Sequence, residues 1–166
     1  VKYDIHAMYK RLIQIGFEVK QIENVSKDQI IPALEDNASN SPCDAIHIVY
    51  FTGHGGHANG NNYIYPIDFA SRFDTSKDIE TSAMNIRDII SIYKGKGRLI
   101  LILDACRSDF ESSKGYYSEI TAAEDVYIAY GTQFQHTSIG ISNEMSPFTK
   151  AICDEILEPN IDVDEL

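Results

Sequence analysis

Two apolar segments of this chain end in residues that can carry out nucleophilic chemistry. The run from Ala45 to Phe51 leads into TGHGG, which contains His54, and the run RLILIL leads into DACRS, which contains Cys106. A cysteine beside a histidine forms a thiolate–imidazolium pair, in which the thiolate is the nucleophile. If the two segments are neighbouring strands, the sequence predicts a Cys–His dyad at one edge of a sheet.

The glycines beside His54 fit the same chemistry. They let a substrate carbonyl approach the backbone, and the N–H groups of Gly55 and Cys106 could stabilise the oxyanion that forms during acyl transfer. Other uses of this segment stay open. His54 and His57 could belong to a metal site, although no carboxylate or cysteine stands at ligand spacing nearby. A phosphate-binding loop is disfavoured, because turn residues follow rather than a helix N-terminus. Either reactive residue could also be structural.

Asp104 lies two residues before Cys106, so both side chains would point to the same side of an extended strand. A carboxylate there would raise the pKa of the thiol. A raised thiol pKa makes the nucleophile less reactive, and this disadvantage is offset if the carboxylate pairs with an Arg or Lys of a substrate next to the scissile bond. The alternative is a strand-end aspartate that caps the following turn.

The segments that must position these residues alternate between helices and strands. Periodic apolar residues, a capping box from Ser26 to Gln29 and the Ser146-Pro147 helix start predict helices over 3–15, 26–37, 84–93 and 147–158. Strands are predicted over 17–22, 45–52, 63–65, 98–103 and 126–130, with a turn at 59–62. Continuous apolar strands between helices indicate a single-domain α/β fold, with a mostly parallel central sheet and helices on both faces. The carboxyl ends of such strands are where functional groups gather.

Composition excludes several classes of protein. With 25 acidic residues against 14 Lys and Arg, the net charge is -11, which argues against nucleic acid and against anionic membrane surfaces as partners. No apolar run approaches the roughly 18 residues that span a bilayer. Three widely spaced cysteines form neither a disulfide framework nor a Cys-x-x-Cys metal motif, so a cytoplasmic location is expected.

The motifs VYFTGHGG and LILDACRS resemble the His and Cys motifs of the caspase-like cysteine peptidases. Cys106 follows His54 by 52 residues, and caspases place the histidine about 50 residues before the cysteine. Asp104 stands where caspases have Gln, and an acid there is the pattern of metacaspases and paracaspases. DACR is nearer to paracaspases and bacterial caspase-like proteins. The segments GNNYIYPID, YIAYGT and SPFTKAICDEIL resemble the same group, so the likeness covers most of the chain.

The resemblance implies a role for each matching residue. His54 would be the general base and acid, Cys106 the nucleophile, and Gly55 an oxyanion N–H donor. Asp104 and Asp4 would line the pocket for an Arg or Lys before the cut. For Asp4 the residues alone leave a second interpretation open, that of a first-turn aspartate stabilised by the helix dipole.

The resemblance also carries expectations about partners and cofactors. The chemistry requires no cofactor. Calcium activates many metacaspases, but no ligand spacing for it is evident here. The expected partner is a peptide or protein substrate with Arg or Lys before the cut, with an activator as a further candidate, and the oligomeric state is not predicted. Lys114-Gly115 is a candidate self-cleavage site or an exposed, solvated lysine. The first strand of the fold and its C-terminal end are expected to lie outside these 166 residues.

The sequence therefore predicts a cysteine endopeptidase with a Cys–His dyad that cleaves after Arg or Lys through an acyl-enzyme. Three alternatives remain. An Asp-specific caspase would need a basic pocket, against which Asp104 and Asp4 argue. A catalytically silent caspase-like scaffold would not need both His54 and Cys106. A metal-binding protein would use His57.

Overall fold

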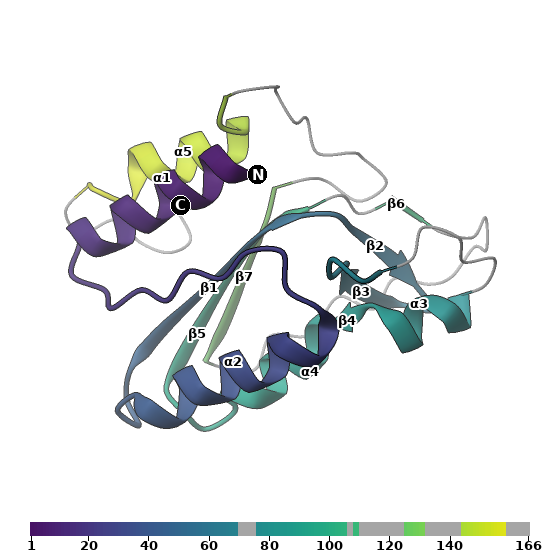
Figure 1. Cartoon of the computed structure of the whole chain (residues 1–166). Helices are drawn as coiled ribbons and strands as arrows, with labels where there is room; N and C mark the ends of the chain where they lie inside the picture. The colour runs from purple at the N-terminus through teal and green to yellow at the C-terminus, as the bar shows by residue number, and fades with distance from the viewer. Residues whose placement is uncertain (70–75, 106–107, 110–124, 132–143, 159–166) are drawn as a thin grey trace. The chain divides into compact units, whose positions relative to one another are not determined.

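The structure is a computed structural model that describes residues 1–69, 76–105, 108–109, 125–131 and 144–158 (Figure 1). It divides into two compact units, one of Val1–Glu23 with Ser138–Leu166 and one of Asn24–Thr137. Each unit is described by itself. Cys106 and the Lys114-Gly115 pair lie outside the described residues.

A parallel sheet forms the centre of the larger unit. Its strand order is β1-β5-β7, and both pairings are parallel. The strands are β1 (Ile46–Gly53), β5 (Arg98–Ala105) and β7 (Val126–Tyr130). The central strand β5 is the RLILIL segment, whose continuous apolar character suits a strand that is buried between two neighbours. The predicted α/β fold with a mostly parallel central sheet is confirmed.

Two helices cover one face of this sheet. They are α2 (Lys27–Asn40) and α4 (Ile86–Tyr93), and they lie side by side in Figure 1. Ile30 of α2, Ile86 and Ile89 of α4, and Leu101 and Leu103 of β5 belong to one buried apolar cluster. Alternate residues of a strand point to opposite faces, so this cluster marks one face of β5 and leaves Asp104 on the other.

A second, smaller sheet of the same unit has the order β4-β3-β2-β6. Its strands are β2 (Gly55–Ala58), β3 (Asn61–Ile64), β4 (Met84–Asn85) and β6 (Ser108–Asp109). β2 and β3 form an antiparallel hairpin, in which Asn59 and Gly60 both have positive φ angles, of 48° and 75°. Asn-Gly is the dipeptide that two-residue hairpin turns favour for this reason.

The smaller unit contains two helices that lie side by side, α1 (Lys2–Gln14) and α5 (Pro147–Glu155). Met8 and Leu12 of α1 and Ile152 of α5 are buried. Ser146 is the N-cap of α5 and its side chain accepts a hydrogen bond from the Thr149 N–H, as the Ser-Pro helix start predicts.

Several predicted boundaries were wrong. The segment 17–22 is not a strand: Gly16, with φ of 95°, ends α1, and Ile22 is exposed. Alternating apolar residues suggested a strand there, but among the described strands none pairs with it. Helix α2 continues to Asn40, three residues past the predicted end at 37. The sequence also gave no sign of β2, of β6 or of the helix α3 (Ser76–Ser82).

Gly97 fixes the start of the β1–β5 pairing. Its φ is +107°, and a Cβ added to it would lie 2.1 Å from the Ala45 carbonyl oxygen. That oxygen accepts the Arg98 N–H at 3.0 Å. We expect Gly97→Ala to lower the free energy of unfolding by about 3 kcal/mol or more, because positive φ and a backbone clash add together. Gly95→Ala, with positive φ but open space, should cost only about 1 kcal/mol. If urea unfolding shows the same loss of unfolding free energy for Gly97→Ala and Gly95→Ala, the backbone clash at Gly97 is not the cause.

Tyr93 gives the fold a pH dependence in the alkaline range. Burial raises its pKa to about 12, from an ordinary value of 10. Between these two pH values the unfolded chain has released the Tyr93 proton and the folded chain has kept it. The free energy of unfolding should therefore fall by about 1.4 kcal/mol per pH unit in that window. Tyr93→Phe should remove this contribution to the pH dependence of the free energy of unfolding. If that free energy falls with pH equally in the wild type and in Tyr93→Phe, Tyr93 is not the group responsible.

Candidate active site

The strand register brings His54 to the point where β5 leads into Cys106. β1 and β5 pair from Ile46–Arg98 to Gly53–Ala105, and in every pair the second residue number exceeds the first by 52. The pairing between β2 and β6 keeps the same offset, with Gly56 opposite Ser108. His54 directly follows Gly53, and Cys106 directly follows Ala105 in the sequence. The described pairs therefore keep one register on both sides of His54.

His54 itself lies at the junction between β1 and β2. His54 is exposed to solvent, whereas the four residues of β2 that follow it are buried. The His54 carbonyl oxygen accepts a hydrogen bond from the Tyr65 N–H at 2.9 Å. The backbone at His54 is therefore held while the imidazole reaches solvent. Gly55, the next residue, starts the hairpin opposite Ile64.

Asp104 is buried near the end of β5, with 3% of its surface exposed. It lies opposite Thr52 of β1 in the register and on the face of β5 away from α2 and α4. A buried carboxylate is stable where it is paired or hydrogen-bonded, and Asp104 has such an interaction in the structure.

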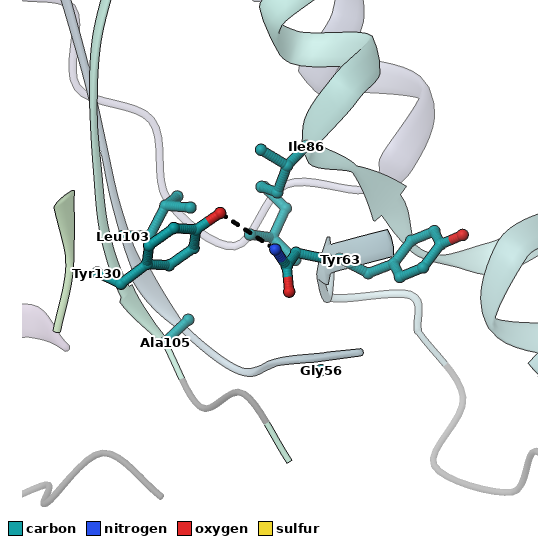
Figure 2. Close-up of a pocket in the computed structure, with 8 residues that line it drawn as sticks. Gly56, Tyr63, Ile86, Leu103, Ala105 and Tyr130 are labelled. Atoms are coloured by element: carbon teal, nitrogen blue, oxygen red, sulfur yellow. Dashed lines mark hydrogen bonds between the residues drawn. The ribbon is translucent and has the colours of Figure 1, made fainter. Parts of the chain in front are cut away.

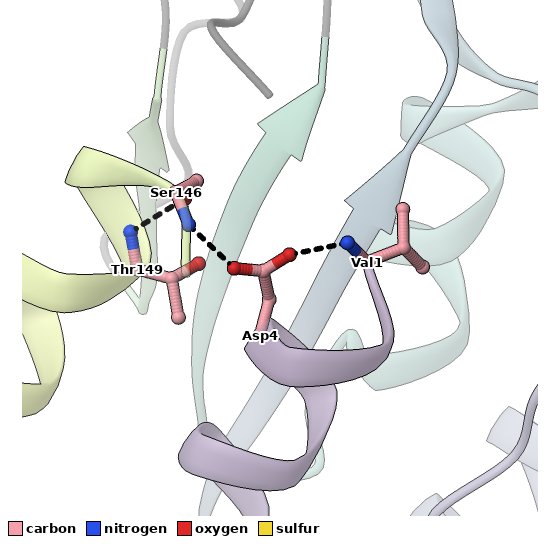
Figure 3. A network of polar contacts seen from close by, with 4 residues as sticks. All are labelled: Val1, Asp4, Ser146 and Thr149. Atoms are coloured by element: carbon pink, nitrogen blue, oxygen red, sulfur yellow. Dashed lines mark hydrogen bonds and ion pairs between the residues drawn. The ribbon is translucent and has the colours of Figure 1, made fainter. Parts of the chain in front are cut away.

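Asp4, the other predicted pocket acid, joins the starts of α1 and α5. One carboxylate oxygen accepts the Ser146 N–H at 2.7 Å, and the other lies 2.6 Å from the Val1 amino group (Figure 3). An acid at helix N-termini is favoured by the helix dipole. The hydrogen bond from Ser146 gives Asp4 a structural role, and its place in a substrate pocket stays a prediction.

The family model of the caspase domain matches residues 1–166. The chain belongs to the caspase domain family. This confirms the resemblance inferred from the His and Cys motifs.

Two curated relatives of this caspase-family chain are the mucosa-associated lymphoid tissue lymphoma translocation protein 1 of Homo sapiens and its Mus musculus homolog. Each is 20% identical over 166 residues, which is 93% of this chain and 19% of the relative. The chain thus spans about a fifth of the length of these relatives. Together with the family match, the similarity supports a caspase-like protease at the level of the family.

Of the three cysteines in this caspase-family chain, two lie in the described part. Cys43 is exposed and Cys153 is buried, and neither forms a disulfide. Burial raises the pKa of the Cys153 thiol and so disfavours the thiolate that a nucleophile needs. Cys153 is therefore a structural residue of α5.

The rival interpretation of His57 as a metal ligand finds no geometric support in the described ranges. His57 is a buried residue of β2, opposite Asn62 of β3, whereas His54 is exposed. Across the described residues, no three His, Cys, Asp or Glu side chains gather as a metal site would require. Among the helices that the structure describes, none is both long and apolar enough to cross a bilayer.

Two further residues of this region, Asn62 of β3 and Tyr130 of β7, were not predicted from the sequence to have a role. Asn62 Nδ2 donates a hydrogen bond to Tyr130 Oη at 3.1 Å, which links the two sheets. Both lie in segments that carry the family resemblance, GNNYIYPID and YIAYGT, and that location was the available signal.

Proposed function

We propose that this caspase-family domain is a cysteine endopeptidase that cleaves after Arg or Lys. Cys106 is the nucleophile and His54 the general acid and base. The observation that supports the pairing is the constant offset of 52 residues, which is the same in β1–β5 and in β2–β6. If that register continues across the intervening residues, His54 and Cys106 would lie opposite each other.

The reaction follows from these two groups. The Cys106 thiolate attacks the peptide carbonyl carbon, and the C–N bond breaks as His54 donates its proton to the leaving amine. Water then attacks the thioester, with His54 accepting a proton, and releases the new carboxylate and the thiol. The Gly55 N–H is the proposed oxyanion donor, since it comes directly after His54 and has no side chain to obstruct a substrate.

The preference for Arg or Lys is assigned to Asp104. A buried carboxylate two residues before the nucleophile can pair with a cationic substrate side chain, and a bidentate pair with arginine is the strongest of these. Asp4 is proposed as a second pocket acid on the family resemblance alone. The same pocket would repel an aspartate before the cut, which is why an Asp-specific caspase is disfavoured.

The proposed enzyme is expected to work without a cofactor, in a reducing compartment and on a polypeptide substrate. Thiolate and imidazole supply the nucleophile and the proton transfers, so no cofactor is assigned, and calcium is treated as a candidate activator. A reducing, cytoplasmic setting suits the free cysteines. The proposed partner is a polypeptide with an exposed Arg or Lys, and nucleic acid and membranes are not assigned as partners.

The test uses four fluorogenic peptides that differ only in the residue before the reporter, which is Arg, Lys, Asp or Ala. The purified protein and its Cys106→Ala variant are assayed with and without calcium. Cleavage after Arg or Lys that is lost in Cys106→Ala is the expected result. Cleavage after Asp would overturn the pocket assignment, and full activity in Cys106→Ala would overturn the mechanism. Failure of every peptide, together with no reaction of Cys106 with an alkylating inhibitor, would favour the scaffold alternative.

A further inference from the structure

A partly buried hydrogen bond connects the two sheets of the larger unit close to the proposed dyad. Asn62 belongs to β3 of the smaller sheet, and Tyr130 is the last residue of β7 in the parallel sheet. The Asn62 amide nitrogen donates to the Tyr130 hydroxyl at 3.1 Å, and Figure 2 marks this bond with a dashed line. It thus ties the hairpin that follows His54 to the sheet whose central strand precedes Cys106.

The other amide atom of Asn62 lacks a partner. Asn62 is 8% exposed, and its Oδ1 is the buried side-chain atom that finds no hydrogen-bond partner within the described part of the chain. Exchanging the oxygen and nitrogen of the amide would not help, because the atom turned away from Tyr130 would still be unpaired. Buried polar groups in native proteins are nearly always satisfied, often by an internal water.

Space for such a water exists at this place. A cavity of about 10 Å³ is lined by Asn62, Tyr130, Gly56, Leu103 and Ala105, among others (Figure 2). That volume is close to the minimum for one water molecule. Gly56 and Ala105 have the smallest side chains, which leaves the gap open between β2 and β5.

We propose that Asn62, Tyr130 and one internal water on Asn62 Oδ1 form a buried polar bridge that holds the hairpin and the parallel sheet at a fixed spacing. This rests on the proposed function in one respect, that the spacing matters for catalysis. Gly56 lies two residues after His54, and Ala105 comes directly before Cys106. Because both border the cavity, the bridge sets the separation of the two segments that carry the dyad. Asn62 and Tyr130 are therefore positioning residues.

The test compares Asn62→Leu and Tyr130→Phe with two matched controls. Asn61→Leu changes the neighbouring, partly exposed asparagine of β3, and Tyr127→Phe removes the hydroxyl of another β7 tyrosine. Tyr130→Phe deletes a single oxygen atom, so it keeps the test valid if Asn62→Leu fails to fold. The readouts are the number of long-lived internal waters, from ¹⁷O magnetic relaxation dispersion, and kcat and KM for the best of the four peptides.

We expect Asn62→Leu to lose one long-lived water relative to the wild type and to Asn61→Leu. Both bridge variants should lower kcat about 10- to 100-fold, because small displacements of reacting groups have effects of that size. KM should stay within about twofold, since the bridge positions the dyad rather than the substrate. The controls should match the wild type in both readouts.

Two results would overturn the proposal. If Asn62→Leu keeps the full number of internal waters, Oδ1 does not hold one. If the water is lost but kcat is unchanged, the bridge does not position the dyad. Should the wild type cleave none of the peptides, the proposed function fails separately, and the water count still decides whether the bridge exists.

Discussion

Replacing Cys106 with alanine is expected to lower kcat for peptide cleavage by on the order of 10⁴-fold or more, because no other group can form the thioester. His54→Ala should have an effect of similar size, since the thiolate is then not formed and no imidazolium donates a proton to the leaving amine. The losses of kcat caused by the two substitutions should not multiply when the substitutions are combined. The double variant should be no slower than Cys106→Ala, because residues that act as one unit lose their whole contribution together.

The matched control for this prediction is Cys43→Ala, which removes an exposed thiol from the loop before β1. Its kcat and KM should equal those of the wild type. Retention of more than a few per cent of the activity in Cys106→Ala would mean that a different residue attacks the substrate. Additive losses in the double variant would mean that His54 and Cys106 act independently.

Replacing Asp104 with asparagine is expected to reduce kcat/KM for the Arg peptide by about 100-fold or more. Removing one partner of a buried charge pair leaves the other charge unpaired, and such truncations typically cost 2–5 kcal/mol, a figure that applies here by analogy. The Ala peptide offers no cation, so its cleavage rate should change little. The discriminating quantity is therefore the ratio of the two kcat/KM values.

Asp88→Asn is the control for Asp104→Asn, because Asp88 is an exposed aspartate in the first turn of α4. It should leave the ratio of kcat/KM for the Arg peptide to that for the Ala peptide unchanged.

Asp4→Asn separates the two interpretations of Asp4. A lower ratio would support a second pocket acid, and a lower melting temperature with an unchanged ratio would support the helix-linking role seen in its hydrogen bond with Ser146. For Asp104→Asn, an unchanged ratio of kcat/KM for the Arg and Ala peptides would mean that Asp104 does not bind the substrate cation.

The parallel sheet was predictable because its strands are continuous apolar runs. RLILIL forms β5, and the segment 126–130 forms β7 with the predicted bounds. Burial on both sides leaves little alternative for such sequences. The register itself was not predictable, since it depends on pairing between strands that are far apart in the sequence.

The strand β2 of the smaller sheet could not be read from local sequence, although the turn at 59–62 and part of β3 were predicted. β2 has the sequence GGHA, which lacks the apolar and β-branched residues of a typical strand. It forms because β3 pairs with it through the Asn59-Gly60 turn and β6 pairs on its other side. The opposite error occurred at 17–22, where an apolar pattern had no strand beside it. In both cases tertiary pairing, rather than propensity, decided the outcome.

The candidate site shows the same division. His54, Cys106 and Asp104 could be chosen from their residue types at strand ends, where chemistry is expected. The contact between Asn62 and Tyr130 joins residues that are 68 positions apart, so neither residue stood out by itself. Burial and an unpaired oxygen atom, which only coordinates reveal, identified them.

The central claim is that Cys106 is a nucleophile activated by His54 in a site that accepts arginine. The most direct measurement treats the protein with a peptidyl-arginine acyloxymethyl ketone and locates the adduct by tandem mass spectrometry. We predict a single adduct on Cys106, strongly slowed in His54→Ala and absent when the arginine is replaced by aspartate. An adduct on the exposed Cys43 instead, or equal labelling of Cys106 with and without His54, would contradict the account.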